Sequence, residues 1–301
     1  MIEKQKVFLG CATAIVTPFN NGEIDYTSFE NLIEYQIENG VDGIVVLGTT
    51  GEAPTINEIE REDIISFARD KIKGRVPLVV GTGTNSTEST IRYSKSACTL
   101  GADAILCVCP YYNKPTKSGI LEHYKALAKA VDLPIILYNV PSRTGVNIPI
   151  GAYGKLSNIE NIVGIKEASG NIAYLGEIKE RYAEYYSLYT GNDDLTLSSL
   201  AMGADGVISV VSNALPSEMK ELCQSFFKGD ILKSRKIQLA LLPLIKEMFY
   251  ETNPVPIKEL LSQLNLCKNA HRLPLFSSTR QKEISFFKEQ IEKGFYRKIS
   301  E

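Results

Sequence analysis

Lys166 is the residue of this sequence best placed to do covalent chemistry. It interrupts the apolar run 162–165 near its end, where a flexible cation is excluded unless it is paired or used. Burial disfavours the ammonium form and lowers the pKa of a lysine, and the free amine can then attack a carbonyl carbon to form a Schiff base. The alternative is a structural lysine, paired with a carboxylate such as Glu167 or extended to solvent.

Three other residue groups could act together with such an amine. Tyr138 ends a second apolar run, where its phenol could transfer protons, although a buried tyrosine bonded to the backbone would give the same pattern. Arg143 follows shortly after, and its planar guanidinium suits a carboxylate or, alternatively, a surface ion pair. The turn 48–52 (GTTGE) offers the hydroxyls of Thr49 and Thr50 and several backbone N–H groups to a small carboxylate, or else begins a helix.

Other patterns give weaker support to a site. The segment 81–86 (GTGTNS) nearly matches a dinucleotide-binding GxGxxG motif, but it follows the third apolar run rather than the first. The two histidines, His123 and His271, lie in helical segments, which argues against a Ser-His-Asp triad and a histidine-rich metal site. The run 192–194 (NDD) could hold a cation, but the capped start of a helix is the better interpretation.

The elements that must position these side chains alternate along the chain. Apolar runs bounded by turn residues predict strands, and the segments between them have the apolar period of 3.6 that predicts helices. Three similar stretches, 40–44, 101–105 and 203–207, each place a glycine after a helical pattern and then open an apolar run, as helix-to-strand junctions do. Strands are predicted at 11–18, 43–48, 77–83, 104–110, 134–141, 162–169, 186–191 and 206–211.

This alternation predicts an α/β fold, a (β/α)8 TIM barrel with a C-terminal helical region. Continuous hydrophobicity is typical of parallel strands covered on both faces, and eight βα units close a barrel. An open doubly wound sheet is the alternative, but it usually has a Gly-rich first turn, which this chain lacks. Because barrel enzymes build their sites at the carboxyl ends of the strands, the polar residues above are expected at one mouth.

Two regions are expected along the chain, a catalytic barrel over 1–230 and a helical region over 231–301. The second region has helical patterns at 231–249, 257–264 and 278–293. Their apolar faces are wide, which favours self-association.

Composition limits the class of protein further. The chain has 301 residues and a formal net charge of −2, which gives no support to a nucleic-acid-binding surface. Residues 1–10 lack the pattern of a secretory leader, and no apolar run has the length of a membrane helix. The six cysteines form no CxxC pair, so we expect reduced thiols in a cytoplasmic protein.

The motifs taken together resemble those of a known family. The segments 48–52 (GTTGE), 138–145 (YNVPSRTG) and 164–169 (GIKEAS), on the second, fifth and sixth predicted strands, are similar to those of the dihydrodipicolinate synthases. The similarity covers essentially the whole chain and includes 110–113 (PYYN), 190–194 (TGNDD) and 253–258 (NPVPIK). No single motif is decisive, but their joint occurrence is specific.

The resemblance implies a lyase that condenses pyruvate with L-aspartate 4-semialdehyde to 4-hydroxy-tetrahydrodipicolinate, in lysine and diaminopimelate biosynthesis. It implies no metal, no organic cofactor and no partner beyond small-molecule substrates and other subunits of a homotetramer. Lys166 would form the Schiff base with pyruvate, Thr50 would hold the pyruvate carboxylate, and Arg143 would bind the carboxylate of the aldehyde. The family pattern also matches Tyr138, Thr49 and Tyr112 as a proton relay, Tyr112 coming from a neighbouring subunit, and Gly191 and the backbone carbonyl of Ile208 as substrate contacts.

Alternatives remain at this point. The wider superfamily includes N-acetylneuraminate lyase and 2-keto-3-deoxy sugar-acid aldolases, so a retro-aldol lyase on a keto sugar acid is the second candidate, and a catalytically silent barrel is the third. The pair Thr49 and Thr50 together with Arg143 favours the synthase. Many relatives are inhibited by lysine through a histidine and a glutamate. This chain has Glu58 and Ser89 at those positions, which predicts weak or absent inhibition.

Overall fold

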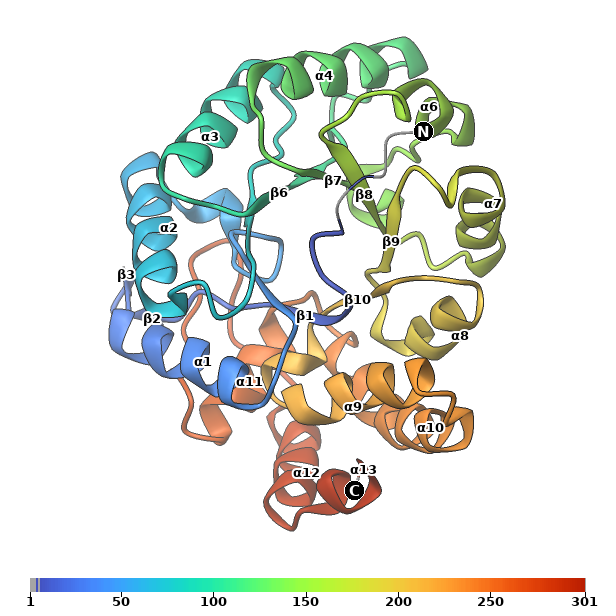
Figure 1. Ribbon diagram of the computed structural model, residues 1–301. Coiled ribbons are helices and arrows are strands. Elements are labelled where there is room, and N and C mark those ends of the chain that lie inside the picture. Colours follow the sequence, from blue (N-terminus) through green and yellow to red (C-terminus); the bar gives the residue numbers. More distant parts are fainter. Residues whose placement is uncertain (1–3, 5, 301) are drawn as a thin grey trace.

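The chain forms a closed barrel of eight parallel strands (Figure 1). The structure is a computed structural model that describes residues 4 and 6–300; the expectation for a leader at 1–10 therefore falls partly outside the described residues. Around the barrel the order is β1, β10, β9, β8, β7, β6, β5 and β4, and β4 pairs again with β1. The predicted TIM barrel is confirmed, and the doubly wound alternative is wrong. The strands are β1 (Gly10–Ala14), β4 (Gly43–Val46), β5 (Leu78–Gly81), β6 (Ala104–Val108), β7 (Ile135–Asn139), β8 (Ile162–Glu167), β9 (Ser187–Thr190) and β10 (Gly206–Ser209).

All eight strands are short and buried, and Val108 is their only residue that is not fully buried. Burial on both faces explains why their sequences are continuous apolar runs. The predicted runs are too long at their carboxyl ends. The run expected at 11–18, for example, forms a strand only as far as Ala14. The residues beyond the strands belong to the loops that surround the mouth of the barrel.

The barrel interior is packed with side chains and is closed at its amino-terminal end. Phe8, which precedes β1, stacks on Tyr189 of β9 with ring centroids 4.1 Å apart. The Tyr189 hydroxyl also donates a hydrogen bond to the Phe8 carbonyl oxygen at 2.9 Å. Because this end is covered, a small molecule reaches the interior from the carboxyl ends of the strands. The other side chains of this cluster include Ala12, Val45, Val79, Leu106, Ile136, Tyr138 and Ile208.

The helices cover the outside of the barrel and bury one face each (Figure 1). Asn57 begins α2 with a reciprocal capping box to Glu60, and Asp25 caps α1. Such caps define where the loops end and the helices begin. The helices are α1 (Tyr26–Glu38), α2 (Glu58–Ile72), α3 (Thr87–Thr99), α4 (Lys117–Ala130), α5 (Pro141–Thr144), α6 (Ile150–Leu156), α7 (Ile172–Tyr182), α8 (Thr196–Ala201) and α9 (Pro216–Phe227).

After the barrel the described chain continues as helices α10 (Ile231–Met248), α11 (Val255–Gln263), α12 (Gln281–Glu292) and α13 (Phe295–Ser300). The helix α10 packs against α9, and α13 lies on both of them. The three helices expected in this region are present. The short helix α13 was not expected, and neither was the hairpin of β2 (Phe19–Asn20) and β3 (Glu23–Ile24).

The structure also bears on the expectations for the cysteines and for membrane helices. All six cysteines are free thiols, and Cys98 is the one that is exposed. Within residues 4 and 6–300, no helix has the length and apolar character needed to cross a membrane.

Candidate active site

A cavity of about 150 Å³ lies at the carboxyl ends of the strands. Eight residues were given a catalytic or substrate-binding role from the family resemblance. Six of them line this cavity, although they come from four separate parts of the chain. They are Thr49, Thr50, Tyr138, Arg143, Lys166 and Gly191; the rest of the lining is Ala14, Val45, Gly48, Leu106, Val140, Ser142, Ala168, Asn192, Val210, Phe249 and Asn253.

Lys166 lies near the end of β8, in register with Tyr138 of β7 on one side and Tyr189 of β9 on the other. It is 6% exposed, and its Nζ lies 4.5 Å from the centre of the Tyr138 ring. Burial lowers the pKa of Lys166 to about 8; the negative charge of Asp193 opposes this shift and the positive charge of Arg143 adds to it. An appreciable fraction of the amine is therefore uncharged near neutral pH, as a carbonyl nucleophile requires.

The structural alternatives for Lys166 were a carboxylate partner such as Glu167 or extension to solvent, and an exposed fraction of 6% does not fit the second. The Glu167 carboxylate instead accepts hydrogen bonds from Nδ2 of Asn139 at 2.8 Å and from the backbone N–H of Ser169 at 2.6 Å. Among the described residues, Lys166 forms no salt bridge. The buried amine is therefore not neutralised by a carboxylate in direct contact.

Tyr138 is the phenol next to this amine. Burial raises its pKa above the ordinary value, Glu167 adds to the shift, and Arg143 and a hydrogen bond with the Thr49 side chain oppose it. The hydroxyl is therefore protonated at neutral pH and can act first as a proton donor.

The turn after β4 carries Thr49 and Thr50, and the buried acid Glu52 holds this turn in place. Glu52 has a left-handed backbone, with φ of 55°, and its N–H donates to the Thr49 carbonyl oxygen at 3.1 Å. Its fully buried carboxylate forms an ion pair with Lys258 of α11, which is also fully buried. Burial acts to raise the pKa of Glu52, but His271, whose Nδ1 lies 3.6 Å from Oε1 of Glu52, and the charge of Lys258 hold that pKa below its ordinary value. The charged pair thus ties the turn to the C-terminal region.

Arg143 lies in α5 at the mouth of the cavity and is exposed. Its Nη2 donates a long hydrogen bond, 3.4 Å, to the backbone carbonyl oxygen of Asn253. The rest of the guanidinium is open to a ligand entering the cavity. A carboxylate is the group that its planar fork binds best.

Gly191 gives Lys166 the space that its side chain occupies. A Cβ at this position would lie 2.7 Å from Lys166 Cε and 2.7 Å from Ala168 Cβ. Both distances are too short for carbon atoms, so a side chain here would displace the amine from the cavity.

We expect Gly191→Ala to lower kcat about 100-fold, because a displacement of about 1 Å at a reacting group costs on that order. The measurement is steady-state kinetics, with thermal unfolding to show that the variant is folded. Gly119→Ala in α4, which lies outside the cavity lining, is the matched control and should keep full activity. A Gly191→Ala enzyme as active as the wild type would contradict this reading.

Two of the residues implied by the resemblance do not line this cavity. Tyr112 is 89% exposed, with a left-handed backbone φ of 69°. Ile208 is fully buried in β10, opposite Ala12 of β1. Their assigned roles stay predictions.

Two buried residues near the site were missed or misread in the sequence. Asn253 lines the cavity and donates from Nδ2 to Thr50 Oγ1 at 3.0 Å. Asp193 begins the short 3-10 helix η2 (Asp193–Leu195), but its carboxylate does not cap it. Instead Asp193 Oδ2 accepts from the backbone N–H groups of Val210 and Val211, both at 3.0 Å. The capping interpretation of Asp193 is therefore wrong.

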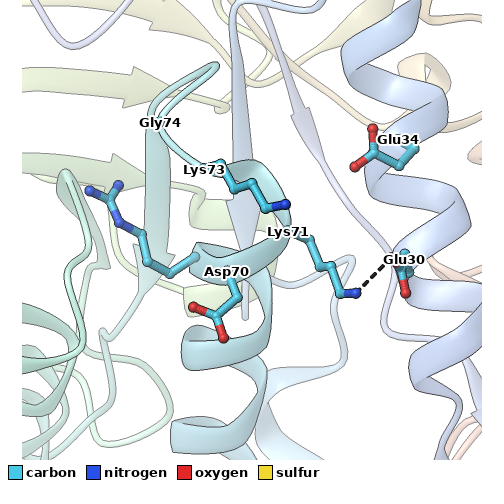
Figure 2. Close-up of a pocket in the computed structure, with 7 residues that line it drawn as sticks. Glu30, Glu34, Asp70, Lys71, Lys73 and Gly74 are labelled. Carbon is cyan, nitrogen blue, oxygen red and sulfur yellow. Dashed lines mark hydrogen bonds and ion pairs between the residues drawn. The ribbon is translucent and has the colours of Figure 1, made fainter.

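A larger groove, about 680 Å³, lies at the opposite end of the molecule, beside the loop that enters β5 (Figure 2). Lys71 and Glu30 form an ion pair there at 2.6 Å, which Figure 2 shows. Glu34 pairs with Arg75, which lies outside the lining. The lining has three acidic and three basic side chains, so its formal charges balance, and it carries none of the residues discussed above. Across the described residues, no group of acidic, histidine and cysteine side chains is arranged to hold a metal ion.

A (β/α)8 barrel with these side chains at its mouth is an enzyme of the class I aldolase type, a lyase. The family model described as "Dihydrodipicolinate synthetase family" matches residues 7–292. The chain belongs to the dihydrodipicolinate synthetase family.

Individual relatives agree with this assignment. A 4-hydroxy-tetrahydrodipicolinate synthase of Thermotoga neapolitana is 48% identical over 279 residues, which cover 91% of this chain and 95% of the relative. The crystal structure of dihydrodipicolinate synthase from Thermotoga maritima has a TM-score of 0.93 at 44% identity, covering 97% of this chain and 100% of that one. A dihydrodipicolinate synthase of Acinetobacter baumannii, solved in complex with pyruvate, has a TM-score of 0.91 at 39% identity. The match covers 95% of this chain and 99% of that one.

Proposed function

We propose that this chain condenses pyruvate with L-aspartate 4-semialdehyde through a Schiff base on Lys166. The product, 4-hydroxy-tetrahydrodipicolinate, is the one named in its relatives, and the reaction belongs to lysine and diaminopimelate biosynthesis. The observation that supports the proposal best is the buried amine of Lys166, whose pKa is lowered to about 8 and which lies beside the Tyr138 ring in the cavity that Arg143 also lines.

The first half of the reaction makes a nucleophile from pyruvate. The Lys166 amine attacks the keto carbon, and water leaves as the iminium forms. The iminium withdraws electrons, so the methyl group of pyruvate loses a proton and an enamine results. Tyr138 and Thr49, with Tyr112 of a neighbouring subunit, form the relay that moves these protons.

The second half joins the substrates and closes the ring. The enamine carbon attacks the aldehyde carbon and restores the iminium on Lys166. The amino group of the second substrate then attacks the iminium carbon and displaces the lysine, so that the free enzyme is regenerated. One water is released overall, and no oxidant or reductant takes part.

Each carboxylate has its own binding group. Thr50 and the neighbouring backbone N–H groups hold the carboxylate of pyruvate, and Arg143 holds that of the aldehyde. Gly191 and the Ile208 carbonyl complete the pyruvate side. The positions of Thr50, Arg143 and Gly191 around one cavity support this division.

The assembly is proposed as a homotetramer of cytoplasmic chains, each with a catalytic barrel over 1–230 and a helical region over 231–301. The exposed Tyr112 supports a subunit contact, because it is a large aromatic side chain that is 89% exposed and does not line the cavity of its own chain. Exposed apolar side chains on the helical region, such as Leu232, Leu239 and Phe286, support further contacts.

A substrate comparison tests the proposed function. Activity is measured with pyruvate and aspartate semialdehyde in a coupled assay, and in parallel with N-acetylneuraminate and 2-keto-3-deoxygluconate. We expect the first pair to be preferred. Preference for a keto sugar acid would show a retro-aldol lyase, and activity on neither would show a silent barrel.

We also expect lysine to inhibit this enzyme weakly or not at all. Glu58, at one position where lysine-sensitive relatives carry other residues, is bound to Arg92 at 2.5 Å. The guanidinium of nearby Arg61 stacks on Tyr93, with Cζ 4.4 Å from the centre of the ring, and donates a hydrogen bond to the Gly81 carbonyl oxygen. Glu58 and Arg61 thus already have partners within the chain, so they offer little to a free amino acid. Steady-state rates in a lysine titration check this, and strong inhibition at sub-millimolar lysine would show it to be wrong.

A further inference from the structure

The side-chain amine of Lys4 is bound by three backbone carbonyl oxygens near the start of β8. Its Nζ donates hydrogen bonds to the carbonyl oxygens of Ser157, Ile159 and Ile162, at 2.7, 2.8 and 2.7 Å. An ammonium has three N–H groups, so these contacts use all of them. Among residues 4 and 6–300, no carboxylate forms an ion pair with Lys4. Within that part of the chain, neutral dipoles therefore hold the positive charge.

An aromatic ring also faces this ammonium. Lys4 Nζ lies 5.0 Å from the centre of the Tyr186 ring, within the range at which the face of a ring attracts a cation. The Tyr186 hydroxyl donates to the Tyr153 carbonyl oxygen at 2.7 Å, which fixes the ring. Burial lowers the pKa of Lys4 to about 8, so at pH 7 most of the amine still carries its charge. The three carbonyl oxygens and the ring together form a cage for one positive charge.

The segment that carries the carbonyl oxygens is held in place by contacts other than those of Lys4. Ser157 is the C-cap residue of α6, where carbonyl oxygens lack a donor within the helix, and Ile162 begins β8. Between them, Nδ2 of Asn161 donates to two carbonyl oxygens at the end of α4, at 3.0 and 2.7 Å. Because these bonds do not involve Lys4, we expect the three carbonyl oxygens to stay together when its amine is removed.

The ligand type and the distances define the free ion that such a cage suits. Oxygen atoms at 2.7–2.8 Å are too distant for calcium, which prefers about 2.3–2.6 Å, and for magnesium, which prefers about 2.0–2.1 Å. Neutral backbone carbonyl oxygens are the groups that replace the hydration shell of potassium in its channels. Ammonium is nearly the same size as potassium and can donate the hydrogen bonds that Lys4 makes. A monovalent cation of this size therefore fits the cage.

We propose that the three carbonyl oxygens form a monovalent-cation site, which this chain fills with the amine of Lys4 and which opens to potassium or ammonium when that amine is removed. The bound amine joins the segment before β1 to the segment that enters β8. The role of the site is structural, because Ile162 lies at the start of β8 whereas Lys166 lies near its end. The inference does not depend on the proposed function.

Chemical rescue of Lys4→Ala tests the proposal. The Tm of the variant is compared with that of the wild type at pH 7, in potassium chloride, ammonium chloride and tetramethylammonium chloride at equal ionic strength. In tetramethylammonium, which is too large for the cage, we expect the variant to unfold about 5 °C below the wild type, because the carbonyl oxygens lose a charged donor. Potassium and ammonium should remove at least half of this difference, increasingly so at higher concentration.

Two further variants separate cation binding from the loss of a lysine. Lys4→Met keeps an apolar side chain of similar length in the space, so neither potassium nor ammonium should restore its Tm. Lys6→Ala is the matched control, because it removes a nearby ammonium that pairs with Asp205 at 2.6 Å. Its difference in Tm from the wild type should be the same in all three salts.

Crystals of Lys4→Ala soaked in rubidium chloride give a direct readout, because rubidium scatters anomalously and is only slightly larger than potassium. We expect an anomalous peak among the three carbonyl oxygens that is absent from wild-type crystals soaked in the same way. The absence of that peak in the variant would overturn the inference. A difference in Tm between Lys4→Ala and the wild type that is equal in all three salts would overturn it as well.

Discussion

Replacement of Lys166 by alanine should abolish turnover. Nothing else in the cavity supplies an amine, so the loss should be on the order of 10⁴-fold or more, as when a covalent nucleophile is removed. The variant should also fail to form an adduct with pyruvate under borohydride. A coupled assay and intact mass spectrometry measure the two effects. Lys129→Ala, at an exposed position of α4, is the control and should behave as the wild type.

The pH dependence of the same step gives an independent check on Lys166. Burial places its pKa at about 8, so the free amine increases as the pH rises through that value. The rate of adduct formation in the wild type should therefore rise between pH 6 and 9 with a midpoint at about 8. A midpoint near the ordinary pKa of an exposed lysine would show that the amine is not desolvated.

Replacement of Arg143 by alanine should separate the two half-reactions. The guanidinium lies at the mouth of the cavity and is not among the groups assigned to pyruvate, so the pyruvate adduct should form as in the wild type. Loss of a charge-assisted contact with the second carboxylate should reduce kcat/KM for the aldehyde about 10- to 100-fold. Steady-state kinetics in each substrate measures the effect.

Arg143→Lys is the companion variant, because it keeps the charge and loses the planar fork. Its kcat/KM for the aldehyde should lie between those of the wild type and Arg143→Ala. If Arg143→Ala also lost the pyruvate adduct, the division of the site into two carboxylate positions would be wrong.

The residues that could be found in the sequence are those that conflict with their local surroundings. Lys166 stands out because an apolar run does not tolerate a cation without a reason. Tyr138 ends a second such run, and Arg143 follows it. The barrel was predictable for a similar reason, because continuous apolar strands alternating with amphipathic helices have few other solutions.

The residues that could not be found act through contacts between distant segments. Asn253 and Thr50 are 203 residues apart, and no local pattern indicates that an amide will meet that hydroxyl. Asp193 has a sequence that suits a helix cap, yet its carboxylate binds the backbone at the end of β10. In both cases the local sequence permits several hydrogen-bond partners, and tertiary packing selects one of them.

The most direct test of the whole account is chemical trapping. The wild-type chain is incubated with pyruvate, reduced with borohydride, and digested for peptide mapping by mass spectrometry. A single reduced pyruvate on the side-chain nitrogen of Lys166, and on no other lysine, is the predicted result. Modification of a different residue, or an unmodified chain after incubation at saturating pyruvate, would contradict it.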